Sequence, residues 1–77
     1  MIDKEVRETQ CEKILRWWEL GYEWINPWEA MDLGIMRLAA RIFDLRSKHG
    51  IQIEEETVYK KNKLGQTIHY SRYRRAA

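Results

Sequence analysis

Basic side chains recur on one face of a helical pattern in the middle of the chain. At 100° per residue this stripe consists of Arg37, Arg41, Asp44 and Lys48, with Ala40 beside it. An arginine can donate two hydrogen bonds to a guanine edge, and a lysine can contact a backbone phosphate. Asp44 can accept from a cytosine amine or pair with a neighbouring cation along the helix. The stripe therefore indicates contact with duplex DNA, and a solvated helix face is the alternative.

The residue types that carry catalysis or bind metals form no recognisable group. His49 and His69 lie far apart in the sequence, and Cys11 falls inside a predicted helix, so the spacing of metal ligands is missing. The consecutive acids Glu54–Glu56 are expected to be solvated rather than to bind a metal. The scattered glycines make no phosphate-binding loop. We therefore expect no enzyme activity, no metal and no cofactor.

A short helix is predicted just before the basic stripe. Asn26 suits the N-cap, Pro27 suits the first helical position, and Glu29 completes a capping box. Gly34 provides a left-handed residue at little cost, so we expect this helix to end at Leu33.

A second helix is predicted to follow at once, from Ile35 to His49. Its buried stripe consists of the apolar residues Ile35, Leu38, Ile42 and Leu45. A short helix, a tight glycine turn and a longer helix make a helix-turn-helix, whose second helix enters a major groove. We expect the N-terminal half of that helix to lie nearest the bases, through Met36, Arg37, Ala40 and Arg41.

The rest of the chain predicts a first helix and a final hairpin. Thr9 and Glu12 form a capping box that opens a helix to about Leu20. Residues 22–25 suit a stub strand or an extended link. After Gly50, strand-like residues surround a turn at 62–65, and the alternation breaks at 54–56, which suggests a bulge or a later strand start. The predicted fold class is α+β: a winged helix-turn-helix, with three helices before a two- or three-stranded antiparallel wing.

The charge of the chain is unevenly distributed, although the net charge is only +2. Residues 1–34 hold eight acids and four bases, whereas residues 57–77 hold six bases and no acid. Phosphate contacts are expected from the hairpin tip and the C-terminal segment, through Lys61, Asn62, Lys63, Arg72, Arg74 and Arg75. The alternative is that the lysines protect an exposed strand edge from aggregation.

Four tryptophans fall within twelve positions, at 17, 18, 24 and 28. Trp18 lies on the apolar stripe of the first helix and is expected in the core. The others are expected to be half-buried lids over a thin core. Alternatively, Trp17, Trp24 and Trp28 form an aromatic patch that binds a second copy of the chain or another protein.

The 77 residues and 44% apolar content predict one small folded domain. We expect a flexible arm over residues 1–8, the domain over 9–75 and a tail over 76–77. No apolar run is long enough to span a membrane, and no leader pattern is present. A single cysteine cannot form an internal disulfide, which favours the reducing cytoplasm.

Several sequence blocks resemble those of small winged helix-turn-helix proteins common in bacteriophages and prophages. The most specific is GIMRLAARIFDLR at residues 34–46, accompanied by TQCE at 9–12, NKLG at 62–65 and RYR at 72–74. The resemblance covers roughly residues 9–75. It implies a phage-type domain that binds double-stranded DNA in a bacterial cytoplasm and regulates transcription or replication. The surplus of tryptophan leaves an alternative open, in which the same fold is a phage-encoded inhibitor or adaptor of a host protein complex.

Overall fold

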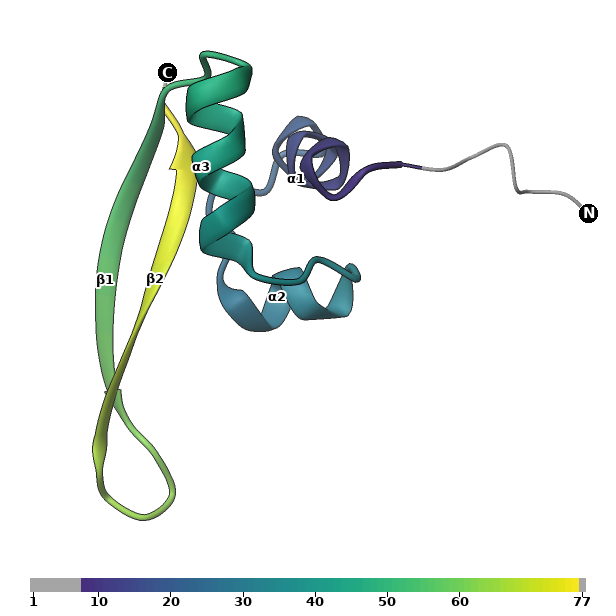
Figure 1. Cartoon of the computed structure of the whole chain (residues 1–77). Helices are drawn as coiled ribbons and strands as arrows, with labels where there is room; N and C mark the ends of the chain where they lie inside the picture. The colour runs from purple at the N-terminus through teal and green to yellow at the C-terminus, as the bar shows by residue number, and fades with distance from the viewer. Residues whose placement is uncertain (1–7, 77) are drawn as a thin grey trace, which may run out of the picture.

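The structure is a computed structural model that describes residues 8–76, and it consists of three helices followed by a two-stranded antiparallel hairpin (Figure 1). The elements are α1 (Gln10–Glu19), α2 (Pro27–Asp32), α3 (Leu38–Lys48), β1 (Ile53–Lys61) and β2 (Thr67–Arg75). This arrangement confirms the predicted fold class. The predicted N-terminal arm lies outside the described residues except for Glu8, and so does Ala77 of the predicted tail.

Both predicted capping boxes are present. The Thr9 hydroxyl accepts from the Glu12 backbone N–H, and the Glu12 carboxylate accepts from the Thr9 N–H at 2.8 Å. Asn26 and Glu29 form the same pair of hydrogen bonds at the start of α2. These bonds satisfy helix N–H groups that would otherwise lack partners, so short helices can begin at defined residues.

The hydrophobic core is small and lies where the three helices meet the base of the hairpin. Its fully or almost fully buried members are Ile14, Ile25, Ala30, Ile35, Leu38, Ile42, Leu45 and Tyr73. Every residue of the predicted stripe from Ile35 to Leu45 is among them. Trp18 packs against this core but stays partly exposed, as do Cys11 and Leu15 from the same helix.

The link between α1 and α2 contributes one bridge to the sheet rather than a full strand. Ile25 pairs antiparallel with Tyr73, and their backbone groups exchange hydrogen bonds of 2.8 Å and 3.0 Å. Both side chains are buried, so this bridge fastens the base of the hairpin to the helices. The predicted third strand is therefore reduced to a single pair.

The hairpin pairs in one unbroken register from Ile53 opposite Arg75 to Lys61 opposite Thr67. The predicted bulge or late strand start at residues 54–56 is wrong, because β1 begins at Ile53 and each of these acids has one partner across the ladder. Glu54 lies opposite Arg74, and Glu56 lies opposite Arg72. The free end of the hairpin extends beyond the helices, as the lower part of Figure 1 shows.

Burial of two weakly acidic side chains predicts that the fold loses stability at alkaline pH. Burial raises the pKa of the Cys11 thiol above its ordinary value of 9.0 and that of the Tyr73 hydroxyl above 10.0, and acidic neighbours add to both shifts. In the unfolded chain both groups lose their protons at the lower, ordinary values. The free energy of unfolding should therefore fall as the pH rises above about 9.

Urea denaturation at a series of pH values from roughly 7 to 11 measures this effect. The variant Tyr73→Phe removes one of the two ionising groups and should make the fall shallower. Equal slopes for the wild type and Tyr73→Phe would show that the tyrosine does not contribute.

Candidate nucleic-acid interface

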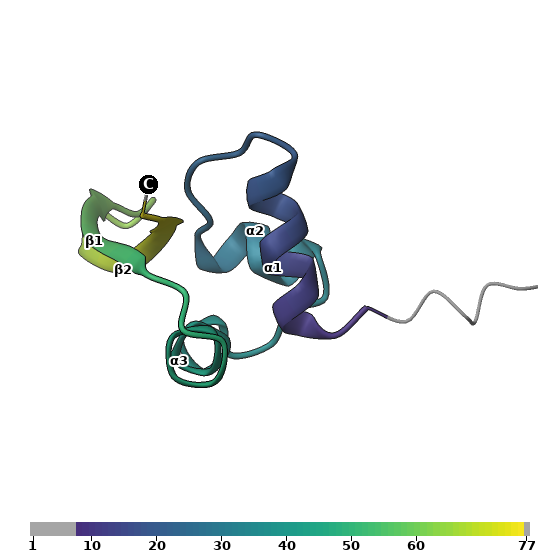
Figure 2. The same cartoon turned by 90° about the horizontal axis from the view of Figure 1, so that it is seen from above.

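Helix α3 lies at one side of the molecule, with α1 and α2 packed behind it and the hairpin beside it (Figure 2). Its inward stripe, formed by Leu38, Ile42 and Leu45, is buried in the core. The opposite side of the helix is open to solvent. Helix α3 is therefore the helix that the fold offers to a groove of DNA.

The turn before α3 is longer than the sequence predicts. The helix begins at Leu38 rather than Ile35, and residues 33–37 form the connection. Ile35 is buried without being helical, and its N–H donates to the Ala30 carbonyl at 2.8 Å. The apolar spacing of Ile35 fits a helix because the residue is buried, although its backbone is not helical.

Arg37 does not lie on the helical stripe, which corrects the prediction for this residue. It precedes the first turn of α3 with φ 56° and ψ 63°, the left-handed conformation, and its side chain is exposed. No side chain caps the first N–H groups of α3. A non-glycine residue held in this conformation is strained, and such residues concentrate at functional sites.

Among the other charged members of the stripe, Arg41 and Asp44 are partly buried, whereas the Lys48 side chain is exposed. Arg41 pairs with Asp44 at 3.3 Å, and Lys48 lies 3.9 Å from the same carboxylate. The Cys11 thiol of α1 donates to the Arg41 carbonyl, and the Arg41 Nε atom is buried without a hydrogen-bond partner. Arg41 is only about one-third exposed, so its guanidinium is less available than the stripe predicts.

The outermost side chains of α3 include residues that sequence reasoning passed over. Phe43 is 66% exposed, and Ser47 is exposed next to it on the helix surface. Arg46 is also exposed and donates to the Ile53 carbonyl at 2.8 Å, on the hairpin side of α3. The sequence does contain a sign of this exposure, because Phe43 is a large aromatic residue that lies off the predicted core stripe.

The hairpin tip holds two lysines on a well-defined turn. The Asn62 side-chain oxygen accepts from the N–H groups of Leu64 and Gln66, both at 2.9 Å. This closes the turn, so Asn62 supports the tip rather than pointing freely at a ligand. Lys61 and Lys63 are exposed, and no acidic side chain among residues 8–76 lies within ion-pair distance of either.

The C-terminal arginines differ in whether they have acidic partners within the chain. Arg72 pairs with Glu56, and Arg74 pairs with both Glu54 and Glu23. The hydrogen bonds to these two carboxylates raise the pKa of the Arg74 guanidinium. Arg72 and Arg74 thus have acidic partners within the chain, which the sequence did not predict, whereas the last residue of β2, Arg75, is exposed.

The described residues match the winged helix-turn-helix domain family from residue 9 to residue 75. The chain belongs to this family. The match spans all three helices and both strands, and a domain of this kind suggests DNA binding. No curated protein and no solved structure matches the chain.

The tryptophans of this winged helix-turn-helix domain mostly support the fold. Trp17 stacks on Tyr22 at 4.1 Å between ring centroids and donates to the Trp24 carbonyl at 2.9 Å. The guanidinium carbons of Arg72 and Arg74 lie 4.3 Å and 4.8 Å from the centre of the Trp24 ring. Both tryptophans are thus half-buried and contact other parts of the domain, and their role at a protein interface stays a prediction.

Trp28 is the more accessible of the predicted interface tryptophans. It is 48% exposed, meets Tyr70 of β2 edge-on at 4.9 Å, and has the Lys60 ammonium 4.9 Å from its ring centre. These contacts join α2 to the hairpin, so Trp28 helps to set the angle of the wing relative to the helices.

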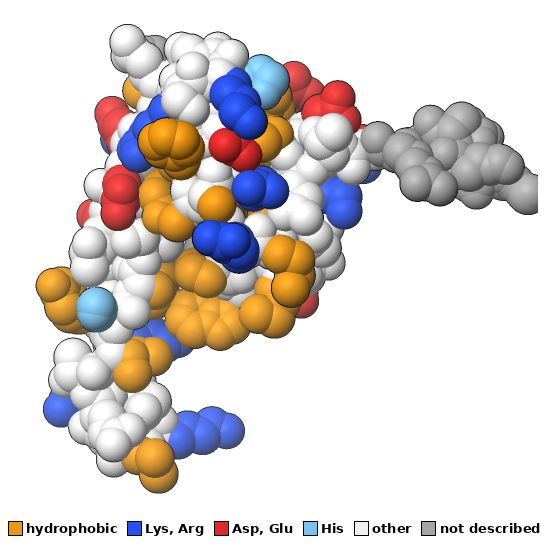
Figure 3. All heavy atoms as spheres, viewed as in Figure 1, with side chains coloured by type: hydrophobic (Ala, Val, Ile, Leu, Met, Phe, Trp, Pro, Cys, Tyr) orange, Lys and Arg blue, Asp and Glu red, His pale blue; other side chains and the backbone are white. Residues whose placement is uncertain are grey.

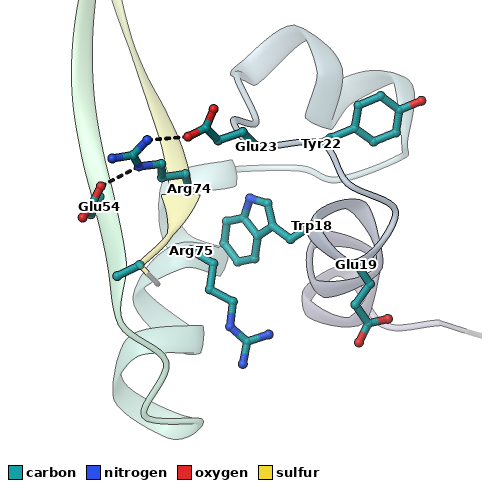
Figure 4. A pocket seen from close by; sticks show the side chains of 8 residues that line it. Trp18, Glu19, Tyr22, Glu23, Glu54, Arg74 and Arg75 are labelled. Carbon is teal, nitrogen blue, oxygen red and sulfur yellow. Dashed lines mark hydrogen bonds and ion pairs between the residues drawn. The ribbon is translucent and has the colours of Figure 1, made fainter.

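A hollow with a volume of about 460 Å³ lies between α1 and the base of the hairpin. Figure 4 shows Arg74 between Glu54 and Glu23, with the Trp18 ring below them. The Trp18 indole nitrogen is buried and has no hydrogen-bond partner. Three of the ionic side chains that line this hollow, Glu23, Glu54 and Arg74, are paired with one another, and these ion pairs fasten the base of the hairpin to the link after α1.

Two further kinds of feature are absent from residues 8–76. No three metal-binding side chains come close enough to hold an ion in this part of the chain. None of its helices has the length and hydropathy of a membrane span.

The strained conformation of Arg37 gives a prediction that separates stability from binding. Arg37→Gly removes the left-handed strain, which costs roughly 1–2 kcal/mol for other residues, but adds some unfolded-state entropy. The free energy of unfolding should stay equal or rise by up to about 1 kcal/mol. Affinity for duplex DNA should fall about ten-fold, because one exposed cation is lost.

The matched control is Arg16→Gly, within the regular helix α1. There the same replacement should lower stability by about 1 kcal/mol, since glycine is unfavourable inside a helix. Urea denaturation and duplex titration measure both quantities. An Arg37→Gly protein less stable than Arg16→Gly would contradict the assignment of strain to Arg37.

Proposed function

We propose that this winged helix-turn-helix domain binds duplex DNA in a sequence-specific manner. Helix α3 enters the major groove, and the hairpin tip lies along the phosphate backbone. One observation carries this proposal. Helix α3 has an open outer face, and the neighbouring hairpin holds two exposed tip lysines without ion pairs among the described residues, Lys61 and Lys63. The family match supports the same function.

Each part of the interface has a proposed role. Arg37 and the uncapped N–H groups of α3 donate to phosphate or to base edges at the helix start. Met36, Ala40 and Arg41 lie near the bases, with Asp44 restraining the Arg41 guanidinium. The remaining cations, Lys48, Arg72, Arg74 and Arg75, add attraction to the phosphates. Paired arginines contribute less than the unpaired tip lysines, because their partners neutralise them.

We further propose that the domain regulates transcription or replication in a phage or prophage. The support is the resemblance of residues 34–46 and their companion blocks to phage proteins. A homodimer on a two-fold symmetric site stays a prediction. The stoichiometry of the complex on a selected duplex, measured by sedimentation, tests it.

Selection of duplexes from a randomised pool tests the proposed function. The expected result is an enriched sequence that binds more tightly than unrelated DNA, with affinity falling steeply as salt rises. Fragments of the source genome can then be tested for binding upstream of promoters or at replication origins. Retention of unrelated and selected duplexes to the same extent at moderate salt would contradict sequence-specific binding.

A protein-interaction module is the second candidate function. This candidate is favoured by exposed apolar side chains on α2 and on the turn after α2, namely Trp28, Met31 and Met36. Figure 3 shows hydrophobic side chains gathered low on the helical body, beside the hairpin. If this face binds a host protein, Met31→Ser should abolish capture of that protein while duplex binding stays unchanged. Duplex binding without any captured protein would count against this candidate.

A further inference from the structure

The outer stripe of α3, on the side opposite its buried stripe, carries uncharged side chains, whereas the two flanks of that outer stripe carry charged ones. Counted at 100° per residue, Ala40, Phe43 and Ser47 lie opposite the buried stripe, where Phe43 and Ser47 are exposed and Ala40 is half-buried. Phe43 is 66% exposed. The Ser47 hydroxyl already donates to the Phe43 carbonyl at 2.8 Å. This stripe therefore offers apolar contact to a ligand and few free side-chain donors.

Cations lie on both flanks of that stripe. Arg46 stands on the hairpin side, where it donates to the Ile53 carbonyl. Lys48 stands on the α1 side, beside a hollow that residues of α1 also line, and Asp44 neutralises part of its charge. A helix lying in a major groove about 12 Å wide has phosphates along both flanks and base edges at its centre. The apolar centre of this face of α3 would thus meet the base edges, and its cationic flanks would meet the phosphates.

The base edge that such a centre fits is that of thymine. Its 5-methyl group is the apolar feature on the floor of the major groove, and alanine and phenylalanine side chains contact it. Guanine recognition would need a free arginine at the centre of the stripe. Arg41 instead lies on the α1 side with its guanidinium tied to Asp44, and Arg37 precedes the helix.

We propose that Phe43, which has the short Ala40 side chain beside it, itself contacts thymine 5-methyl groups and is a specificity-determining residue of the domain. This inference rests on the duplex binding proposed above. Ala40 has a short side chain that lets the helix approach the bases, and Phe43 projects far enough to cover a methyl group. The selected sites should accordingly contain thymine at fixed positions facing α3.

The test replaces each thymine of a selected duplex, one at a time, with deoxyuridine, which lacks only the 5-methyl group. At one or two positions the wild-type affinity should fall about 4-fold, the value of one buried methyl group. Phe43→Ala should bind the thymine and deoxyuridine duplexes equally. Phe43→Leu keeps an apolar side chain and should retain most of the difference. Arg46→Ala should weaken both duplexes and leave their ratio unchanged.

The outcomes separate this inference from the proposed function. A wild-type protein that binds the selected duplex but shows no loss at any deoxyuridine position would overturn the methyl contact and leave duplex binding standing. A methyl effect that persists in Phe43→Ala would overturn the role of Phe43. A selection that enriches no duplex would overturn the proposed function, and the inference with it.

Discussion

Replacing Ile42 with alanine is expected to leave much of the protein unfolded at room temperature. Ile42 is 1% exposed and lies in the core between α3 and its neighbours. Truncating a buried isoleucine to alanine costs about 2–5 kcal/mol. A single core in a chain of this length supplies only about 3–5 kcal/mol of net stability. The loss therefore approaches the whole free energy of unfolding.

The next residue in the sequence provides the matched control. Phe43 has a larger side chain, but it faces solvent, so Phe43→Ala should change stability by less than about 0.5 kcal/mol. Tryptophan fluorescence during urea denaturation compares the two variants. If Phe43→Ala destabilised the protein as much as Ile42→Ala, the outward face assigned to α3 would be wrong.

The starts of α1 and α2 were predictable because their signals are local. A capping box is formed by residues three positions apart, so Thr9 with Glu12 and Asn26 with Glu29 need no knowledge of the tertiary fold. The order of three helices and a hairpin follows from such local signals together with apolar periodicity. This part of the fold was readable from the sequence.

The start of α3 was not readable, because burial and helix formation separate at Ile35. Its side chain is buried although Ile35 lies in the irregular connection before α3, and its N–H donates to the Ala30 carbonyl. Apolar periodicity reports which residues are buried and not which backbone conformation buries them. The same gap hid the left-handed Arg37, since no local residue preference marks an arginine for that conformation.

The sequence alone could not show which arginines have acidic partners, because the strand register decides this. Glu54 and Glu56 look like a solvated acidic run in the sequence, and Arg72 and Arg74 look like free cations. Only the pairing of β1 with β2 sets them opposite each other. Cross-strand neighbours are about 5 Å apart whatever their separation in the chain, so their charges meet. Charge counts by segment could therefore not tell which cations remain unpaired.

Because Lys61 and Lys63 have no acidic partners within residues 8–76, the double replacement Lys61→Ala with Lys63→Ala is expected to have a large effect on affinity for DNA. The tip turn should survive, because Asn62 closes it through its own side chain. Two phosphate contacts would be lost, so affinity should fall about ten-fold and the logarithmic salt slope should flatten by about 2. Selected and unrelated duplexes should weaken to the same extent, since phosphates carry no sequence information.

The matched control removes a paired arginine together with its partner. Arg72→Gln combined with Glu56→Gln keeps the net charge and eliminates one cation that sequence reasoning assigned to DNA. Its salt slope should equal that of the wild type, because the ion pair already satisfies Arg72 within the hairpin. A slope reduced as much as in the lysine variant would mean that Arg72 exchanges Glu56 for a phosphate on binding. The wing would then contact DNA along β2 as well as at its tip.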